Sequence, residues 1–346
     1  MSLHSSSRDP LVLGLDVGGT STRCLVADLR GRRVGVGRSG GANPNGVGMP
    51  VALTRIGEAV VSALADLDPR RVVGAVMGAA GFAAHAAPDE PFTRMWRATG
   101  LTTLPRVVGD ALVGFCAGSS ARDGTIVISG TGAGAVQVAD LEQGLLGDSL
   151  GWLLGDDGSG QWVGREAVRH LLAPRPDAPG RLPDDPLSRA VRDAVLGRPT
   201  SGPGSRDDVI RVLYAGSPLA LSALAPVVVE LARDGDPVAV GILYGAVEHL
   251  ERSVRQVRRP GDRTPVVLTG GLFASEVLRG TLTTALSQRW PLADVLPSGS
   301  GAGGAAWLAA HAPGARAAAS GAGGGDAVPD PAVHTSLTRL PLAVDA

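Results

Sequence analysis

Hydrophobic residues along the chain follow two patterns, short apolar runs that end near glycine and longer segments with a helical period. A short apolar run predicts a buried strand, whereas apolar residues three or four positions apart, such as Leu53, Ile56 and Val60, predict a helix with one buried face. Strands that alternate with helices indicate the α/β class. We expect strands at 11–17, 21–28, 34–38, 72–77, 106–108 and 265–269 with two more inside 126–140, and helices at 51–67, 92–99, 161–172, 219–233, 238–257, 275–289 and 301–310 with another from about residue 111.

The strand–turn–strand pattern at the start of the chain recurs near its middle. Residues 15–28 read LDVGGTSTRCLVAD and residues 126–140 read IVISGTGAGAVQVAD, so both contain a Gly-Thr turn between strands and end in Val-Ala-Asp. The turns at 19–20 and 130–131 lie 111 residues apart. A chance similarity between two segments of a glycine-rich chain is the alternative, but the shared strand pattern favours an internal duplication. Two duplicated domains also fit a length of 346 residues.

Composition limits the compartment and the partners. The chain has 44% hydrophobic residues, and 32 cationic against 33 acidic side chains give a net charge of −1. This balance gives no sign of a nucleic-acid or membrane-surface partner. The apolar run at 11–15 is too short for a signal segment, and no run approaches the ~18 apolar residues of a membrane span. We expect a cytoplasmic protein, with a flexible Ala/Gly-rich tail at 313–346.

All 32 cationic residues are arginine, because the chain contains no lysine. This composition excludes a Walker A loop, the strand lysine of protein kinases and a lysine Schiff base. The two cysteines, Cys24 and Cys116, lie far apart in apolar surroundings and lack the spacing of metal ligands. We therefore expect both to be core residues.

Three glycine-rich turns each follow a short apolar strand. Glycine lets successive backbone N–H groups approach a phosphate, and threonine hydroxyls can add hydrogen bonds. Any one turn could be an ordinary loop, but three of them, two in the duplicated frame, favour nucleotide binding without lysine. They are Asp16-Val17-Gly18-Gly19-Thr20, Ser129-Gly130-Thr131-Gly132 and Thr269-Gly270-Gly271.

Carboxylate and amide side chains accompany these turns. Asp16 lies at the mouth of the first turn and could accompany Mg²⁺. Asp110 follows a strand and precedes a helix, where it could accept a proton from a substrate hydroxyl or simply cap the helix. The acidic turn Gly155–Gly160 and the turn that contains Asn43 and Asn45 could read the hydroxyl or amine groups of a small polar ligand, or serve as turn and cap residues.

Together these motifs resemble the sugar-kinase/actin-like ATPase superfamily, and in particular its N-acetylglucosamine kinase/BadF-type ATPase family. The similarity covers about residues 11–312 and includes Gly151-Trp152-Leu153-Leu154-Gly155-Asp156-Asp157-Gly158-Ser159-Gly160. The resemblance implies two duplicated actin-like (ribonuclease H-like) domains with a central cleft. The N-terminal domain would comprise 11–115 and about 298–312 and bind the sugar, and the C-terminal domain would comprise 116–297 and bind the nucleotide. The family also implies a homodimer.

The resemblance also implies roles for individual residues. Asp110 would be the general base for a sugar 6-hydroxyl, and Asp16 would lie near Mg²⁺. ATP would contact the three glycine-rich turns. The implied nucleotide-binding residues are Gly18, Gly19, Thr20, Thr22, Gly130, Thr131, Gly132, Gly270 and Gly271, and the implied substrate-binding residues are Asn43, Asn45, Gly151, Asp156, Asp157 and Glu166.

The sequence departs from N-acetylglucosamine kinases at places that bear on the substrate. Those kinases continue the second phosphate turn with Ser-Asn, whereas this chain has Ala133 and Gly134. An actinobacterial branch of glucosamine kinases is similar in composition and in its Ala-Asn-Pro-Asn segment. A free amine is cationic, and a carboxylate such as Asp157 or Glu166 could favour it. The resemblance therefore favours glucosamine, with N-acetylglucosamine as the alternative substrate.

Two other functions occur on this fold. Activators of radical dehydratases hold an iron–sulfur cluster between subunits, but Cys24 and Cys116 do not lie in a glycine-flanked ligand loop. Sugar-responsive regulators usually carry an added DNA-binding domain, and about ten residues precede the first strand here. The presence of Asp110 also favours catalysis over sensing.

Overall fold

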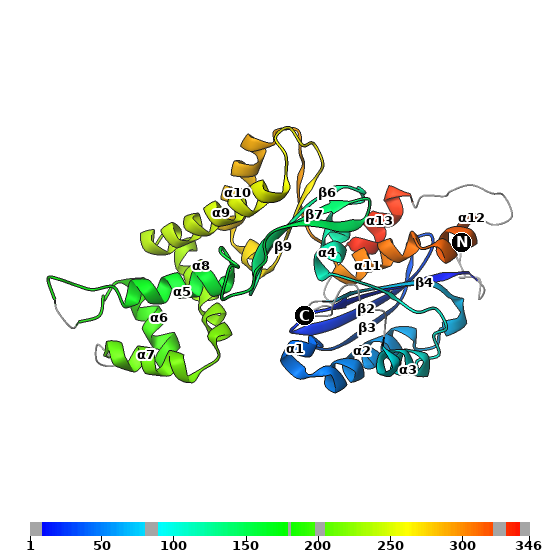
Figure 1. Cartoon of the computed structure of the whole chain (residues 1–346), viewed down its shortest axis with the longest axis horizontal. Helices are drawn as coiled ribbons and strands as arrows, with labels where there is room; N and C mark the ends of the chain where they lie inside the picture. The colour runs from blue at the N-terminus through cyan, green and yellow to red at the C-terminus, as the bar shows by residue number, and fades with distance from the viewer. Residues whose placement is uncertain (1–8, 80–88, 179–180, 198–204, 321–329, 340–346) are drawn as a thin grey trace. The chain divides into compact units, whose positions relative to one another are not determined.

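The computed structural model describes residues 9–79, 89–178, 181–197, 205–320 and 330–339 (Figure 1). The chain divides into two compact units: unit 1 comprises Met1–Gly124, Val138–Gln143 and Leu296–Ala346, and unit 2 comprises Thr125–Gln137 and Gly144–Val295. The expected first domain ends at residue 115. Unit 1 continues further because α4 (Asp110–Gly118) runs through that boundary and packs against α11 (Gly301–Ala310).

The sheet of unit 1 places three strand ends along one edge. Its order is β3-β2-β1-β4-β5, in which β1, β2 and β3 are antiparallel neighbours while β1, β4 and β5 run parallel. Parallel strands end at the same edge, so the segments that follow β1 and β5 lie at one side of the sheet. The strands are β1 (Leu11–Val17), β2 (Ser21–Asp28), β3 (Arg33–Gly40), β4 (Val72–Ala79) and β5 (Arg106–Val108).

Helices cover both faces of this sheet. A Cβ on Gly14 of β1 would overlap backbone atoms of Ala302 and Ala306 in α11, so glycine allows that helix to approach closely. Gly37 of β3 does the same for Ala59 of α2 (Met49–Leu64) on the opposite face, because strand residues alternate in direction. Three short helices also belong to this unit: α1 (Pro44–Val47), η1 (Pro69–Arg71) and α3 (Glu90–Ala98).

The sheet of unit 2 repeats the strand order of unit 1. Its order is β10-β9-β6-β7-β8, and β6 pairs parallel with β9, as β1 pairs with β4. In each sheet the first three strands follow one another through short turns and the fourth joins the free side of the first. The duplicated fold expected from the sequence is thereby confirmed. The strands are β6 (Gly124–Ser129), β7 (Ala133–Ala139), β8 (Glu142–Asp148), β9 (Val266–Thr269) and β10 (Val295–Pro297).

The helices of unit 2 bury a second core around residues such as Val163, Leu243 and Leu282, all of them inaccessible to solvent. The helix expected at 219–233 is a 3₁₀ segment followed by an α-helix, with proline in the first turn of each part. The helices are α5 (Gly160–Leu171), α6 (Pro186–Leu196), α7 (Arg206–Ala215), η2 (Pro218–Leu224), α8 (Ala225–Arg233), α9 (Pro237–Val257), η3 (Gly271–Ala274) and α10 (Glu276–Arg289).

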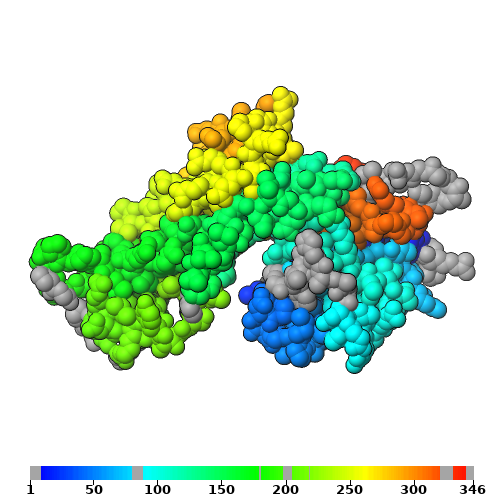
Figure 2. Space-filling model, in the orientation of Figure 1, coloured from blue at the N-terminus to red at the C-terminus, as the bar shows by residue number. Residues whose placement is uncertain are grey.

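The C-terminal segment, expected to be a flexible tail, contains two helices. These are α12 (Pro313–Ser320) and α13 (Pro331–Thr338), and residues 321–329 and 340–346 lie outside the described part. Most of α12, orange in Figure 2, lies at the surface. By contrast, α13 buries Leu337 and His334 against α11. The sequence does not reveal this packing, because α13 is only eight residues long and mixes apolar residues such as Val333 and Leu337 with polar ones.

Two further expectations concern membrane spans and the cysteines. No single helix in the described part is both long and apolar enough to cross a membrane, and one bent pair, Arg206–Ala215 with Leu219–Arg233, meets that test only when its members are joined.

Cys24 and Cys116 are buried free thiols, as expected of core residues. Burial raises the pKa of both thiols, which keeps them protonated at neutral pH.

Candidate active site

The first glycine-rich turn of unit 1 closes the hairpin between β1 and β2. The Gly18 amide donates to Ser21 O at 3.0 Å, while Gly19 and Thr20 remain exposed at the tip. The Ala42 amide donates to Gly18 O at 3.0 Å, so the segment after β3 lies against the same turn. The structure therefore places the turn expected to bind phosphate next to the asparagine segment expected to bind sugar.

Asn43 has a structural role in addition to its expected one. It is the N-cap of α1, and its Oδ1 accepts a hydrogen bond from the Asn45 amide at 3.0 Å. The cap fixes the side chain, which is partly buried, and leaves its NH₂ group as a donor. Asn45 is exposed on the first turn of the same short helix.

Thr22 differs from the other residues expected at the nucleotide. Its side chain is inaccessible to solvent, and its hydroxyl donates to Gly40 O at 2.9 Å. The hydroxyl is therefore used between neighbouring strands and does not reach the exposed tip of the turn. Thr20 lies at the tip of the turn, whereas Thr22 is already part of strand β2. There its side chain lies on a buried face of the sheet.

Asp110 lies close enough to Asp16 to influence its protonation. Desolvation, reinforced by the negative charge of Asp110, raises the pKa of Asp16 from 3.8 to about 6, although the Arg23 guanidinium acts in the opposite direction. Desolvation by the surrounding protein also raises the pKa of Asp110, although its side chain still has access to solvent. Carboxylates that cannot easily ionise together are typical of sites that hold a cation or move a proton.

Asp110 is the first residue of α4 and not its N-cap, which is Gly109. Its Oδ1 accepts a hydrogen bond from the Ala111 amide at 2.9 Å. The side chain is thus oriented by the first turn of the helix while it stays accessible to a ligand. A carboxylate with a raised pKa and solvent access has the properties required of a general base.

The donor set around Asp16 fits a magnesium ion better than a transition metal. Within the described residues no group of three or more His, Cys, Asp or Glu side chains could hold a metal. Mg²⁺ in nucleotide sites usually takes one or two carboxylates and completes its shell with phosphates and water. Two neighbouring carboxylates, one with a strongly raised pKa, match that requirement.

In unit 2 the second and third glycine-rich turns are neighbours. They follow β6 and β9, which pair in parallel with Ile128 beside Thr269. A Cβ on Gly270 would overlap Ser129 O, and Gly270 has a φ of +119°, so only glycine fits there. Gly130, Gly132, Gly270 and Gly271 therefore expose backbone at one edge of the sheet, with Thr131 beside them.

The acidic turn of unit 2 lies against the second glycine-rich turn. The Gly160 amide donates to Gly130 O at 2.7 Å, and the Ser129 hydroxyl donates to Gly158 O at 2.8 Å. A Cβ on Gly132 would lie 2.7 Å from an Asp156 carboxylate oxygen. Three separate stretches of the sequence thus form one site on this unit.

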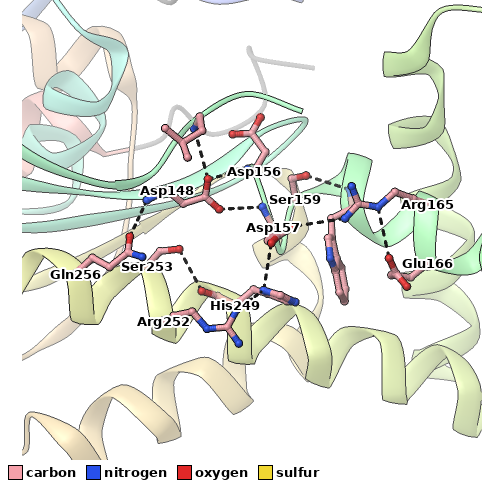
Figure 3. A network of polar contacts seen from close by, with 12 residues as sticks. Asp148, Asp156, Asp157, Ser159, Arg165, Glu166, His249, Arg252, Ser253 and Gln256 are labelled. Carbon is pink, nitrogen blue, oxygen red and sulfur yellow. Dashed lines mark hydrogen bonds and ion pairs between the residues drawn. The ribbon is translucent and has the colours of Figure 1, made fainter. Parts of the chain in front are cut away.

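Asp148, which the sequence analysis missed, organises the acidic turn. Its Oδ1 accepts from the Asp156 amide at 2.8 Å and its Oδ2 accepts from the Asp157 amide at 3.0 Å (Figure 3). The carboxylate of Asp156 points away from this network, and burial raises its pKa. It accepts from the Gly151 amide at 3.3 Å, which connects the turn to another residue expected at the substrate.

Asp157 and Glu166 already have basic partners. Asp157 Oδ1 lies 3.3 Å from Arg165 Nη2, and its Oδ2 lies 3.5 Å from His249 Nδ1 (Figure 3). Glu166 pairs with Arg165 at 3.5 Å and with Arg169 at 3.0 Å. These pairs hold the acidic turn against α5 and α9 and reduce the charge that either carboxylate offers to a ligand.

The fold agrees with comparisons to known proteins. The fold is that of the actin-like ATPases, seen for example in a ROK family glucokinase from Streptomyces griseus solved with glucose and AMPPNP (TM-score 0.53, 22% identity, 87% of this chain and all of that one). More particularly, the chain belongs to the BadF/BadG/BcrA/BcrD ATPase family, whose model matches residues 13–309.

Two similar proteins connect the family to amino sugars. An N-acetyl-D-glucosamine kinase of Dictyostelium discoideum is 26% identical over 309 residues, which cover 83% of this chain and 93% of that protein. A proposed N-acetylglucosamine kinase from Chromobacterium violaceum has a TM-score of 0.68 and 25% identity, with coverage of 88% of this chain and 99% of the other.

Proposed function

We propose that this protein is an ATP:hexosamine 6-phosphotransferase whose preferred acceptor is D-glucosamine, so that it forms glucosamine 6-phosphate. The observation that carries the proposal is the arrangement in unit 1, where Asp110 with its raised pKa lies near Asp16 and Asn43 adjoins the phosphate turn. The match to a family of ATPases and the similarity to N-acetylglucosamine kinases support both the nucleotide and the class of acceptor.

The chain's own residues have distinct roles in this reaction. Asp110 orients the 6-hydroxyl and accepts its proton, which makes the oxygen a better nucleophile. Mg²⁺, held with the help of Asp16, supplies neutralisation of phosphate charge. Backbone amides of the exposed glycines and the hydroxyls of Thr20 and Thr131 hold the phosphate oxygens, while Gly270 and Gly271 border the adenosine.

The packing of Gly134 supports a preference for the free amine. A Cβ at this position would overlap the Ser149 hydroxyl and lie 3.0 Å from Gly147 O. An asparagine therefore cannot replace Gly134 without displacing β8, and Ala133 beside it has no polar side chain. The contact by which N-acetylglucosamine kinases are expected to hold their acceptor is absent from these two positions.

Asp156 is the carboxylate that we assign to the sugar. Its side chain points away from the ion pairs of Asp157 and Glu166, so its charge is less neutralised than theirs. Asn43 and Asn45 supply amide groups for the hydroxyls. Asp157 and Glu166 contribute mainly by fixing the acidic turn through Arg165, and Gly151 does so through its hydrogen bond to Asp156.

The function is tested by ADP release in the presence of Mg-ATP and one of four acceptors: glucosamine, N-acetylglucosamine, glucose or mannosamine. We expect the highest kcat/KM with glucosamine, and we expect Asp110→Asn to lower kcat by about 10²–10⁴-fold because it removes the base. Asp66→Asn, which changes an exposed aspartate after α2, is the matched control and should keep full activity.

The possible outcomes separate the alternatives. A higher kcat/KM with N-acetylglucosamine would favour the alternative substrate while leaving the phosphotransferase intact. Absence of turnover with every hexose, or undiminished turnover in Asp110→Asn, would contradict the kinase proposal. A homodimer and a cytoplasmic location remain proposals from the family resemblance, and light scattering of the purified protein tests the first.

A further inference from the structure

The first turn of α11 lies directly behind Asp16. A Cβ on Gly301 would overlap the Asp16 carboxylate, so the helix backbone touches this side chain without an intervening group. Ser300 is the N-cap, and its hydroxyl accepts from the Gly303 amide at 3.3 Å. Any shift in the first turn of α11 must therefore move or free the carboxylate.

The C-terminal end of α13 is bound to this same turn. The Ser300 amide donates to Thr338 O at 2.9 Å. A Cβ on Gly303 would overlap Leu337 O, so backbone meets backbone where the two helices cross. Leu337 is fully inaccessible to solvent, which shows that this end of α13 is packed and not merely adjacent.

The middle of α13 is anchored to the helix that carries Asp110. His334 Nε2 lies 2.8 Å from Cys116 O near the end of α4, and the His334 and Trp307 rings meet edge to face at 5.1 Å between centroids. Burial lowers the pKa of His334, so at neutral pH the ring is uncharged. The chain just before α11 is tied to the same helix, because the Gly299 amide donates to Ala117 O at 3.1 Å.

A third attachment connects α13 to the β2–β3 turn. The Ser336 hydroxyl donates to Gly31 O at 2.8 Å, and Arg33 Nη2 donates to Leu337 O at 2.8 Å. These contacts hold the exposed side of the helix. They are independent of the buried contacts at His334, and so they can be removed without creating a cavity.

We infer that residues 330–339 form a positioning element for the phosphoryl-transfer site, here called the C-terminal clasp. The clasp contacts both α11, whose first turn supports Asp16, and α4, whose first residue is Asp110. It also lies beyond residues 13–309, the part of the chain that the family model matches. The inference rests on the proposed function, in which Asp16 accompanies Mg²⁺.

The test compares full-length variants in hydrogen–deuterium exchange and in kinetics. His334→Ala removes the bond to Cys116 O, whereas His334→Gln keeps an N–H donor and should restore it in part. Ser336→Ala releases the exposed attachment and avoids a buried change. Thr335→Ala, on the exposed side of α13, is the matched control.

We expect His334→Ala to speed amide exchange in residues 299–303 by about 3- to 10-fold, the factor that one hydrogen bond is typically worth. The apparent half-saturation concentration for Mg²⁺ should rise by a similar factor and kcat should fall, while KM for the sugar stays unchanged. Ser336→Ala should show smaller changes in the same direction. A purely structural role would reduce the active fraction and leave the Mg²⁺ dependence as it was.

Two results would overturn the clasp. One is unchanged exchange at 299–303 in both His334→Ala and Ser336→Ala. The other is faster exchange with no change in the Mg²⁺ dependence, which would leave the segment a packing element only. If the unaltered protein shows no hexose kinase activity, the proposed function fails, whereas the exchange measurement still decides whether α13 holds the first turn of α11.

Discussion

At the scale of single residues, the negative charge of Asp16, desolvated and beside Asp110, lowers the stability of the ligand-free protein. The folded protein raises the pKa of Asp16 from 3.8 to about 6, so the charged form is disfavoured. Between these two pH values the folded state holds a proton that the unfolded state releases, and the free energy of unfolding therefore falls as pH rises through this window. Above pH 6 the free energy of unfolding stays lowered by the full amount until a cation binds near Asp16.

Because the charged Asp16 carboxylate destabilises the ligand-free protein, we predict that Asp16→Asn stabilises the protein while it impairs catalysis. At pH 7.5, without Mg²⁺ or nucleotide, the free energy of unfolding should rise by about 1–3 kcal/mol, because roughly two pKa units correspond to this range after allowance for partial solvent access. The gain should shrink toward pH 4, where Asp16 is protonated in the folded state. Calorimetry at the two pH values measures both effects.

Asp66→Asn is the control for that comparison, since it removes an exposed carboxylate from the same unit. An Asp16→Asn variant that is less stable than the parent at pH 7.5 would contradict the electrostatic interpretation. It would show that Asp16 contributes a needed interaction even when the site is empty.

Among the candidate site residues, most of those that the sequence singles out follow strands or lie in glycine turns. Asp16, Asp110 and the exposed glycines are recognisable because strand ends in a parallel sheet converge. The partners of Asp157 are not recognisable from the sequence, although Arg165 on α5 follows it by only eight residues, and His249 on α9 is far away in the chain. Which of these side chains faces Asp157 depends on how α5 and α9 pack, and a local pattern does not encode that packing.

At the scale of elements, the acidic turn of unit 2 depends on a carboxylate from a different strand. Asp148 accepts from two successive amides, those of Asp156 and Asp157, and uses one oxygen for each. Asp156 has a φ of 57°, in the left-handed region, so this turn needs outside support to keep its conformation.

We therefore predict that Asp148→Asn raises KM for the sugar more than KM for ATP. An asparagine side chain retains one acceptor, while its NH₂ group faces an amide donor, so one hydrogen bond is lost and a repulsive contact replaces it. The expected increase in the sugar KM is about 10-fold, the equivalent of roughly 1.4 kcal/mol. Steady-state kinetics with each substrate varied in turn measures it.

Gln256→Ala provides a reference for that variant, because Gln256 Oε1 accepts from the Asp148 amide at 2.9 Å and so contacts the backbone of Asp148, whereas the acidic turn contacts its carboxylate. Equal increases in the KM for sugar and for ATP would argue against a specific role of the acidic turn. They would point instead to a general loosening of β8.

Most of the regular elements could be predicted, and the exceptions share a physical cause. Strand β8 is exposed along most of its length, so it lacks the apolar alternation that reveals a strand. Helix α13 is short and rich in small and polar residues, yet it packs because Gly303 of α11 and Gly299 just before that helix allow close approach at the crossing. In both cases the partner element determines the structure, and the segment's own pattern does not.

At the scale of the whole molecule, the repeated turn in the sequence predicted the duplicated fold because both sheets build their first three strands the same way. The duplication also repeats a Gly-Thr turn, for which we propose phosphate binding through backbone amides and threonine hydroxyls. Since the chain has no lysine, neither copy can add the ammonium group that many nucleotide sites use.

This composition predicts that nucleotide binding depends strongly on Mg²⁺. Amide dipoles alone neutralise only part of a triphosphate's charge, so the divalent ion near Asp16 should supply the remainder. A non-hydrolysable ATP analogue with Mg²⁺ at 100 times its Kd should stabilise the protein by about 2.7 kcal/mol, and with excess EDTA much less. Thermal unfolding measures both conditions, and Asp16→Asn should lose most of the Mg²⁺-dependent part. Equal stabilisation with EDTA would instead indicate that arginine side chains, the remaining strong cations of this chain, neutralise the phosphate charge.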